Sequence, residues 1–199
     1  MSFENDDDEN YIPVKAILIG DVFVGKTSLI NVSIGMQFNP KEKATISSTF
    51  VQKKMTIDSK EFRINLWDTA GQERLKSLEK LFFKGSQVVI FVYDITDKNS
   101  FIGLKKWVEE VENILENKYV CGIVGNKQDL YSQEQVKEDE VMEYAESKGM
   151  KFKLVSAKDN PKGFNDFLEE LVKDGINIFE KKRKISLVKK KKKKLNCNC

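Results

Sequence analysis

Histidine is absent from the 199 residues of this chain, and cysteine occurs only three times. Without histidine the chain can hold neither a Ser-His-Asp or Cys-His nucleophilic site nor a metal site with histidine ligands. Cys121 lies in an apolar run and is expected to be an inert core thiol, whereas Cys197 and Cys199 stand too close together to staple a fold. The sequence therefore excludes a disulfide-rich scaffold and fits a reducing cytosol.

Long hydrophobic runs are also missing. The longest continuous apolar segment, residues 88–93, has six residues, whereas a helix that spans a bilayer needs about 20. The first residues are acidic rather than basic and apolar, and position 2 is Ser2 rather than glycine. We therefore expect no transmembrane helix, no secretory signal and no N-myristoylation.

Charge is distributed unevenly along the chain. The formal net charge is +3, yet residues 181–194 carry ten basic side chains and no acidic one. The remaining residues hold 24 basic and 31 acidic side chains, a net charge near −7. We therefore expect a disordered acidic N-terminus at residues 1–11, one globular domain at residues 12–180, and a disordered polybasic tail at residues 181–199.

Strand-like and helix-like segments alternate through the globular part. Short apolar runs rich in valine and isoleucine predict buried parallel strands, and two further runs flank a polar turn and predict an antiparallel hairpin. Strands are expected at residues 14–19, 50–57, 62–67, 88–93, 119–124 and 152–155. Helices are expected at residues 26–34, 101–115, 141–148 and 164–172, the second of them capped by Asn99 or Ser100. This alternation predicts an α/β fold with helices on both faces of a mostly parallel sheet.

The first motif that carries chemistry is G-D-V-F-V-G-K-T at residues 20–27, which follows a predicted strand and opens a predicted helix. Glycines let the backbone wrap closely around phosphates, and amide N–H groups then face the anionic oxygens. Lys26 would reach the β and γ phosphates, and the Thr27 hydroxyl would ligate Mg²⁺. The alternative is a chance strand–turn–helix that contains a lysine. The expected phosphate-binding residues are Asp21, Val22, Phe23, Val24, Gly25, Lys26, Thr27 and Ser28.

The second motif, D-T-A-G-Q-E at residues 68–73, directly follows the predicted hairpin. Asp68 at a strand end could hold Mg²⁺ through water, Gly71 leaves room for its N–H to approach a γ-phosphate, and Gln72 could orient an attacking water. A polar loop after a hairpin would explain these residues alone, but not beside a phosphate loop.

The third motif, N-K-Q-D at residues 126–129, follows another apolar run. Asp129 can accept hydrogen bonds from N1–H and the 2-amino group of guanine, whereas adenine would leave that carboxylate unpaired. Residues 156–158, S-A-K, follow the last predicted strand and can support the base. These elements favour GTP over ATP, and the expected base-binding residues are Asn126, Lys127, Asp129, Ser156, Ala157 and Lys158.

Taken in this order, the motifs resemble those of the Ras superfamily over residues 13–180, and W-D-T-A-G-Q-E-R and V-Y-D-I-T resemble its Rab family. The resemblance implies a P-loop NTPase three-layer sandwich, with a mostly parallel six-stranded sheet and one antiparallel strand. It also implies that Phe38 packs on guanine and that Thr45 joins Thr27 and Asp68 at Mg²⁺. Switch segments would lie at residues 38–48 and 69–82.

The activity that the resemblance implies is hydrolysis of GTP to GDP and phosphate, with Lys26 and Gln72 as catalytic residues. Implied partners are an exchange factor, a GTPase-activating protein, effectors and a GDP-dissociation inhibitor. The protein itself would be a monomeric switch in vesicle trafficking. Val22 departs from the Ras pattern, which has glycine there. Its bulk either slows hydrolysis and favours a GTP-bound binding module, or is tolerated, since Rabs often carry a non-glycine residue there and still hydrolyse GTP. An ATP-using P-loop phosphotransferase is a further alternative, which Asp129 disfavours.

The C-terminal tail predicts attachment to a membrane. Each cation near an anionic lipid surface contributes about 1 kcal/mol, and a lipid chain combined with a basic patch anchors firmly. By resemblance, Cys197 and Cys199 would carry prenyl groups and place the protein on the cytoplasmic face of intracellular membranes, in exchange with the cytosol. Nuclear localisation, RNA binding and a merely solvating tail are alternatives. None of them uses the cysteines, and the tail lacks aromatics for base stacking, so no nucleic acid is expected.

Overall fold

The computed structural model describes residues 11–45, 49–69, 83–115 and 119–196. Within them, six strands form one sheet in the order β2-β3-β1-β4-β5-β6, all parallel except for the antiparallel pair of β2 and β3. The strands are β1 (Ile12–Ile19), β2 (Thr49–Ile57), β3 (Lys60–Asp68), β4 (Val88–Asp94), β5 (Val120–Asn126) and β6 (Lys151–Leu154). The α/β fold with one antiparallel edge strand is therefore confirmed.

The positions of the strands follow from their side chains. All seven residues of β4 are buried, as expected for a central strand that is covered on both faces. Strands β2 and β3 are joined by the two residues Asp58 and Ser59, whose φ angles are 49° and 61°. Positive φ at both central residues matches the twist of a tight hairpin, so β2 is added antiparallel at the edge.

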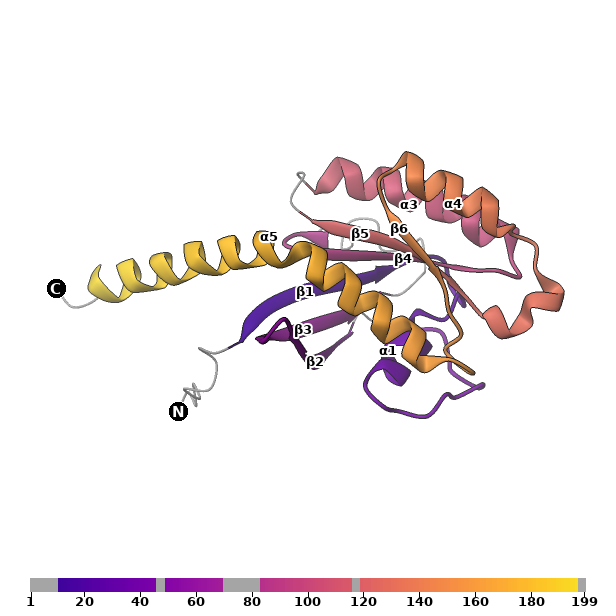
Figure 1. The fold of residues 1–199 in the computed structure, drawn as a ribbon, viewed down its shortest axis with the longest axis horizontal. Coiled ribbons are helices and arrows are strands. Elements are labelled where there is room, and N and C mark those ends of the chain that lie inside the picture. The colour runs from indigo at the N-terminus through magenta and orange to yellow at the C-terminus, as the bar shows by residue number, and fades with distance from the viewer. Residues whose placement is uncertain (1–10, 46–48, 70–82, 116–118, 197–199) are drawn as a thin grey trace.

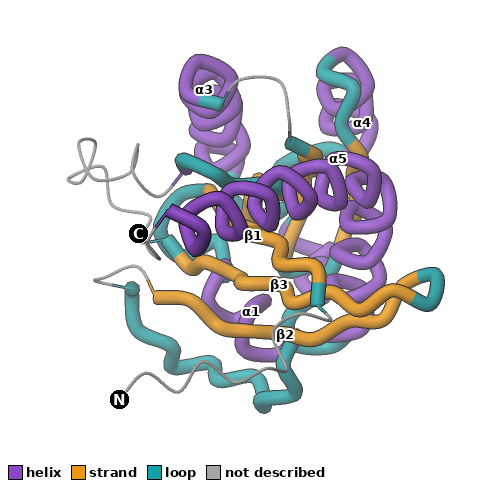
Figure 2. Tube along the Cα trace, turned by 90° about the vertical axis from the view of Figure 1, so that its left-hand side faces the viewer, coloured by secondary structure: helices purple, strands orange, loops and turns teal. Residues whose placement is uncertain are grey.

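Helices cover both faces of the sheet (Figures 1 and 2). One face packs against α1 (Lys26–Ser33) and α5 (Pro161–Asn196), and the other against α3 (Lys98–Ile114) and α4 (Glu138–Ser147). A short 3₁₀-helix, η3 (Gln128–Gln133), follows β5. Each face of the sheet has its own hydrophobic core, so the sheet is held between two apolar interfaces and its strand ends are fixed in space.

The start of α3 differs from the sequence expectation. Asp97, rather than Asn99 or Ser100, caps the helix: it has extended backbone angles, and its carboxylate accepts a hydrogen bond from the Asn99 amide at 2.9 Å. Ser100 lies inside the first turn and its hydroxyl instead donates to the Asp97 carbonyl at 2.7 Å. The cap belongs to Asp97 because its backbone is the one outside the helix.

The end of α5 also differs from the expectation of a disordered tail. The backbone of α5 is helical to Asn196 and projects away from the body of the molecule (Figure 1). No glycine or proline follows Gly175, and lysine is a good helix former, which permits this continuation. The expectations for residues 1–10 and for Cys197 and Cys199 concern positions outside the described residues.

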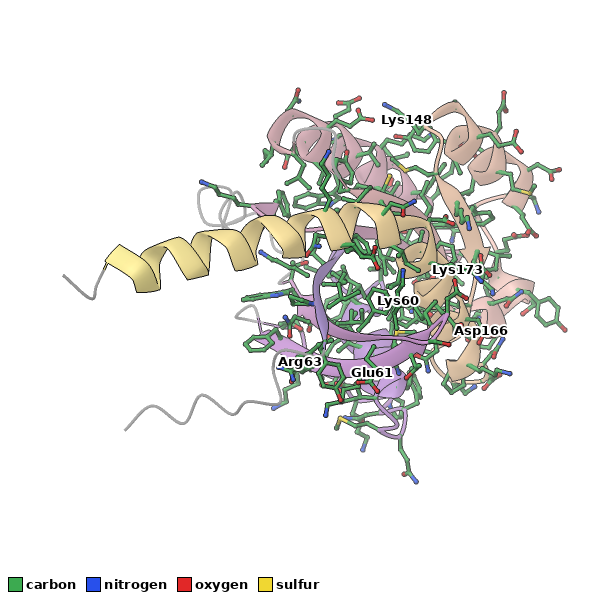
Figure 3. The ribbon with its side chains drawn as sticks, turned by 60° about the vertical axis from the view of Figure 1, so that its left-hand side comes forward. Lys60, Glu61, Arg63, Lys148, Asp166 and Lys173 are labelled. Carbon is green, nitrogen blue, oxygen red and sulfur yellow. The ribbon has the colours of Figure 1, made fainter. Side chains whose placement is uncertain are left out.

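Ion pairs fasten α5 to the hairpin. Lys60 pairs with Glu180 at 2.6 Å and Lys173 with Asp58 at 3.3 Å, and Figure 3 shows Lys60 and Lys173 on the same side of the molecule. These pairs are half exposed, so each contributes about 1 kcal/mol or less, and the buried Phe179 does more to hold the helix.

Among the helices of the described residues, none is both long enough and apolar enough to span a membrane.

Candidate functional site

A cavity of about 550 Å³ opens at the carboxyl ends of the parallel strands, where ligands bind in folds of this kind. Its walls come from the loop after β1 with the start of α1, the segment after α1, and the segments after β3, β5 and β6. Most of the predicted site residues meet there: Val22, Phe23, Gly25, Lys26, Thr27, Ser28, Phe38, Thr45, Asn126, Lys127, Asp129, Ala157 and Lys158. Segments far apart in the sequence therefore converge on one cavity.

The loop between β1 and α1 depends on glycine where its backbone passes close to other groups. A Cβ at Gly20 would overlap the carbonyl oxygen of Val92, and one at Gly25 would overlap the side-chain amide of Asn126. Gly25 also has φ of 95°, in the left-handed region that favours glycine. The loop is thus held close against β4 and β5.

Lys26 is the buried cation of this loop. The residue is only 5% exposed, and its ammonium donates hydrogen bonds of 2.8 Å to the carbonyls of Gly20 and Asp21. Burial lowers the pKa of Lys26 to about 8, although Asp68 and Asp21 act to raise it. A cation that is desolvated and only partly compensated in this way favours an anionic ligand such as a phosphate.

Three side-chain oxygens meet beside Lys26. The Thr27 hydroxyl donates to the Asp68 carboxylate at 2.6 Å, the Thr45 hydroxyl donates to the same carboxylate oxygen at 3.1 Å, and the two hydroxyls lie 2.7 Å apart. These residues come from α1, the loop before β2 and the end of β3. The three residues that the sequence assigned to a metal ion are therefore clustered together.

The cluster has the donor set of a hard cation. Asp68 Oδ1 is buried and has no hydrogen-bond partner among the described residues. Burial raises the pKa of this carboxyl, although hydrogen bonds from Thr27 and Thr45, the charge of Lys26 and the Thr69 backbone all act to lower it. Mg²⁺ takes oxygen ligands and is often held by one or two protein groups together with water and phosphate. Within the described ranges, no group of three or more Cys, Asp or Glu side chains is placed to hold a metal ion.

The other end of the cavity is built by Asn126 and Asp129. Asn126 is 1% exposed, and its side chain donates to the Val24 carbonyl at 2.9 Å and accepts from the Ala157 amide at 3.2 Å. The Asp129 carboxylate accepts from the Ser156 hydroxyl at 2.6 Å. Asp129 thus keeps acceptor capacity beside the cavity while its orientation is fixed from behind.

Two contacts of this site were missed by reasoning from the sequence. Lys127, in a left-handed conformation with φ of 67°, pairs with the buried Asp94 carboxylate at 2.6 Å. The indole of Trp107 donates to Asp21 at 3.0 Å and so ties the phosphate loop to α3. The position of Asp94 directly after a predicted strand was the available signal, whereas nothing in the sequence pairs Trp107 with Asp21.

The remaining predicted residues are not part of the cavity wall. Val24 is 1% exposed and belongs to the core, Asp21 faces Trp107, and Ser156 acts from behind Asp129. Gly71 and Gln72 lie outside the described residues, so their predicted roles concern positions of which the structure says nothing.

The sequence is similar to those of known proteins. The sequence model of the Ras family matches residues 15–177. The chain is 41% identical over 162 residues to the Ras-related protein Rab-21 of Geodia cydonium, covering 81% of this chain and 70% of that protein. It is 42% identical over 159 residues to Rab-21 of Homo sapiens, with coverage of 80% and 70%. Identity to the Ras-related protein RABA5a of Arabidopsis thaliana is 35% over 184 residues, with coverage of 92% and 82%.

Proposed function

Because this chain belongs to the Ras family and is a Rab-like small GTPase that hydrolyses GTP, we propose that its cavity binds the nucleotide between the phosphate loop and Asp129. The observation that carries this proposal is the convergence of two unlike ends on one cavity. A buried lysine and a cluster of hydroxyls form one end, and a fixed carboxylate forms the other. The first end suits a polyphosphate and the second suits a purine with two donors.

At the phosphate end, Lys26 supplies the positive charge and the loop backbone supplies amide donors. The ammonium would exchange its bonds to the loop carbonyls for bonds to phosphate oxygens, which are stronger because both partners are charged. Burial disfavours the charged form of Lys26, and the phosphates of the nucleotide would stabilise that form as its anionic partner. Lys26 therefore both positions the phosphates and stabilises the charge that develops during hydrolysis.

Mg²⁺ fits the neighbouring cluster. Thr27 and Thr45 would ligate the ion through their hydroxyls, and Asp68 would hold it through water, with the partnerless Asp68 Oδ1 as a further acceptor. When bound, such an ion neutralises charge on the β and γ phosphates. The side chains of Thr27, Thr45 and Asp68 fix the place of that charge because they come from three separate elements.

At the base end, Asp129 selects guanine. Its carboxylate can accept from N1–H and the 2-amino group, while Ser156 holds its orientation. Phe38, half-buried and packed against the core, lines the same cavity and would cover the base, and the Lys127 stem and Ala157 complete the wall. An adenine would leave the Asp129 carboxylate facing an acceptor, which is costly because this side chain is only 9% exposed.

Hydrolysis and its regulation complete the proposal. Gln72 is proposed to orient the attacking water, and Gly71 to donate its N–H to the γ-phosphate. Intrinsic turnover in this class is low, roughly 10⁻⁴ s⁻¹, and an activating protein adds about 10⁵-fold. Val22 lines the cavity and supports the second candidate, a slowly hydrolysing, GTP-biased binding module. Turnover measured with and without an activating protein separates the two.

We further propose that the protein is a monomeric switch in vesicle trafficking that cycles between cytosol and the cytoplasmic face of intracellular membranes. Ten basic residues at positions 181–194 precede Cys197 and Cys199, the proposed prenylation sites. A lipid chain together with a basic segment gives firm anchoring to an anionic surface. An exchange factor, activating protein, effectors and GDP-dissociation inhibitor would act on the two switch segments.

Competition for the purified full chain tests nucleotide binding. Fluorescent GDP is bound in Mg²⁺ buffer and displaced by GDP, ADP or inosine diphosphate, which lacks only the 2-amino group. We expect displacement in the order GDP, inosine diphosphate, ADP, and faster release after EDTA. Equal competition by ADP, or retention that is indifferent to Mg²⁺, would reject the site. Localisation of the chain with and without Cys197→Ser and Cys199→Ser tests membrane anchoring separately.

A further inference from the structure

Phe23, in the loop between β1 and α1, is unfavourable in two independent ways. Its φ angle is 67°, in a region that bulky side chains rarely adopt and that glycine occupies without cost. The residue is also 70% exposed, although burial of a phenyl ring is favourable. Strain of this kind tends to persist where a residue serves a site, and Phe23 lines the nucleotide cavity.

The surrounding loop prevents Phe23 from relaxing. The next residue, Val24, is 1% exposed, and its carbonyl accepts a hydrogen bond from the side-chain amide of Asn126 at 2.9 Å. Gly25 then passes so close to Asn126 that no side chain would fit. Because the backbone is fixed directly after Phe23, the ring stays at the cavity wall instead of turning into the core.

We propose that the Phe23 ring covers the bound nucleotide on its phosphate and sugar side and thereby sets the rate of nucleotide release. This inference rests on the proposed function and assigns a role to the side chain of a residue whose backbone alone was expected to bind. The ring would be buried against the sugar and would keep water from the phosphates. Water exclusion strengthens the attraction between Lys26 and those phosphates.

The position of Phe23 relative to Phe38 supports a cover of this kind. The two aromatic residues line one cavity from separate segments, the loop before α1 and the segment after it. Phe38 is half-buried against the core, whereas Phe23 is mostly exposed. Phe23 therefore has the larger surface still available for contact with a ligand.

Release of fluorescent GDP from the full chain in Mg²⁺ buffer tests the proposal. Phe23→Ala removes the ring and keeps the strained backbone, Phe23→Gly removes both, and Phe23→Leu keeps apolar bulk. We expect Phe23→Ala and Phe23→Gly to accelerate release on the order of ten-fold and Phe23→Leu to do so less. Tyr131→Ala is the matched control: Tyr131 is 77% exposed and does not line the cavity, so its loss should leave release unchanged.

A second readout does not depend on rates. Emission from a Phe23→Trp variant should change when GDP is added, relative to the unsubstituted chain, and emission from Tyr131→Trp should not. Release from Phe23→Ala at the wild-type rate, or acceleration by Phe23→Gly alone, would overturn the proposal. A wild-type chain that retains no guanine nucleotide would refute the proposed function and this inference together, whereas wild-type retention with unchanged Phe23 variants refutes the inference alone.

Discussion

Replacing Asp129 by asparagine is expected to change the preferred base from guanine to xanthine. The carboxylate offers two acceptors, which match N1–H and the 2-amino group of guanine. An asparagine offers one acceptor and one NH₂ donor, which match N1–H and the 2-carbonyl of xanthine. The shape of the side chain is kept, and the Ser156 hydroxyl that bonds Asp129 at 2.6 Å can still reach an oxygen.

The magnitude follows from the burial of Asp129. Its side chain is 9% exposed, so solvent screens it little. A hydrogen bond to a charged group is worth about 1.5–3 kcal/mol, and a buried donor left facing another donor costs a further ~1–3 kcal/mol. The loss for GDP is therefore about 2.5–6 kcal/mol, which corresponds to roughly a 10²–10⁴-fold weaker affinity. Xanthosine diphosphate should regain much of that difference.

The assay is equilibrium competition of GDP and xanthosine diphosphate against a fluorescent nucleotide, on Asp129→Asn and wild type. Asp159→Asn is the control, because Asp159 is 60% exposed and not part of the cavity wall, so the same chemical change there should leave GDP affinity within about two-fold. An Asp129→Asn protein that still prefers GDP over xanthosine diphosphate would refute the assignment of this carboxylate to the base.

Three further predictions concern single side chains. Thr27→Val should remove most of the Mg²⁺ dependence of GDP release, because the hydroxyl bonded to Asp68 is lost; a release rate that EDTA still accelerates as in wild type would contradict this. Val22→Gly should raise the single-turnover rate of GTP hydrolysis several-fold, and equal rates would clear Val22 of hindering turnover. Burial raises the pKa of Cys121 from 9.0 to about 11, so in a Cys197→Ser, Cys199→Ser chain its alkylation at pH 8 should be about 100-fold slower than in denaturant. The same shift stabilises the fold below pH 9, and that stabilisation should be lost as the pH rises from about 9 through 11.

The sequence predicted the sheet well because its central strands are continuously apolar and end at polar motifs. β4 is buried along its whole length, so local composition alone identifies it. The cap of α3 was assigned wrongly because three capping residues, Asp97, Asn99 and Ser100, stand within four positions. Only the backbone angles decide among them: Asp97 is extended, with φ of −129°, and therefore precedes the helix.

Contacts within the site were harder to predict than its members. Motif spacing identified Lys127 and Asp21, but their partners Asp94 and Trp107 come from other elements, and Trp107 lies 86 residues away from Asp21. Such pairs depend on the register of β4 against β5 and on the packing of α3, which local patterns do not specify. In the register, Asp94 is directly opposite Asn126, and this brings its carboxylate within reach of Lys127.

A single buried side chain joins the two ends of the cavity. Asn126 donates to the Val24 carbonyl in the phosphate loop and accepts from the Ala157 amide beside the base site. Because Asn126 links the phosphate loop to the base site, both ends of the cavity are held in place before a nucleotide binds. This lowers the conformational entropy that is lost on binding. Thr45 differs, since it reaches the site through hydrogen bonds to Thr27 and Asp68 rather than from a strand or helix. Any response to the γ-phosphate should therefore arise where Thr45 meets these two residues, while the hydrogen bonds of Asn126 to Val24 and Ala157 stay constant between the nucleotide states.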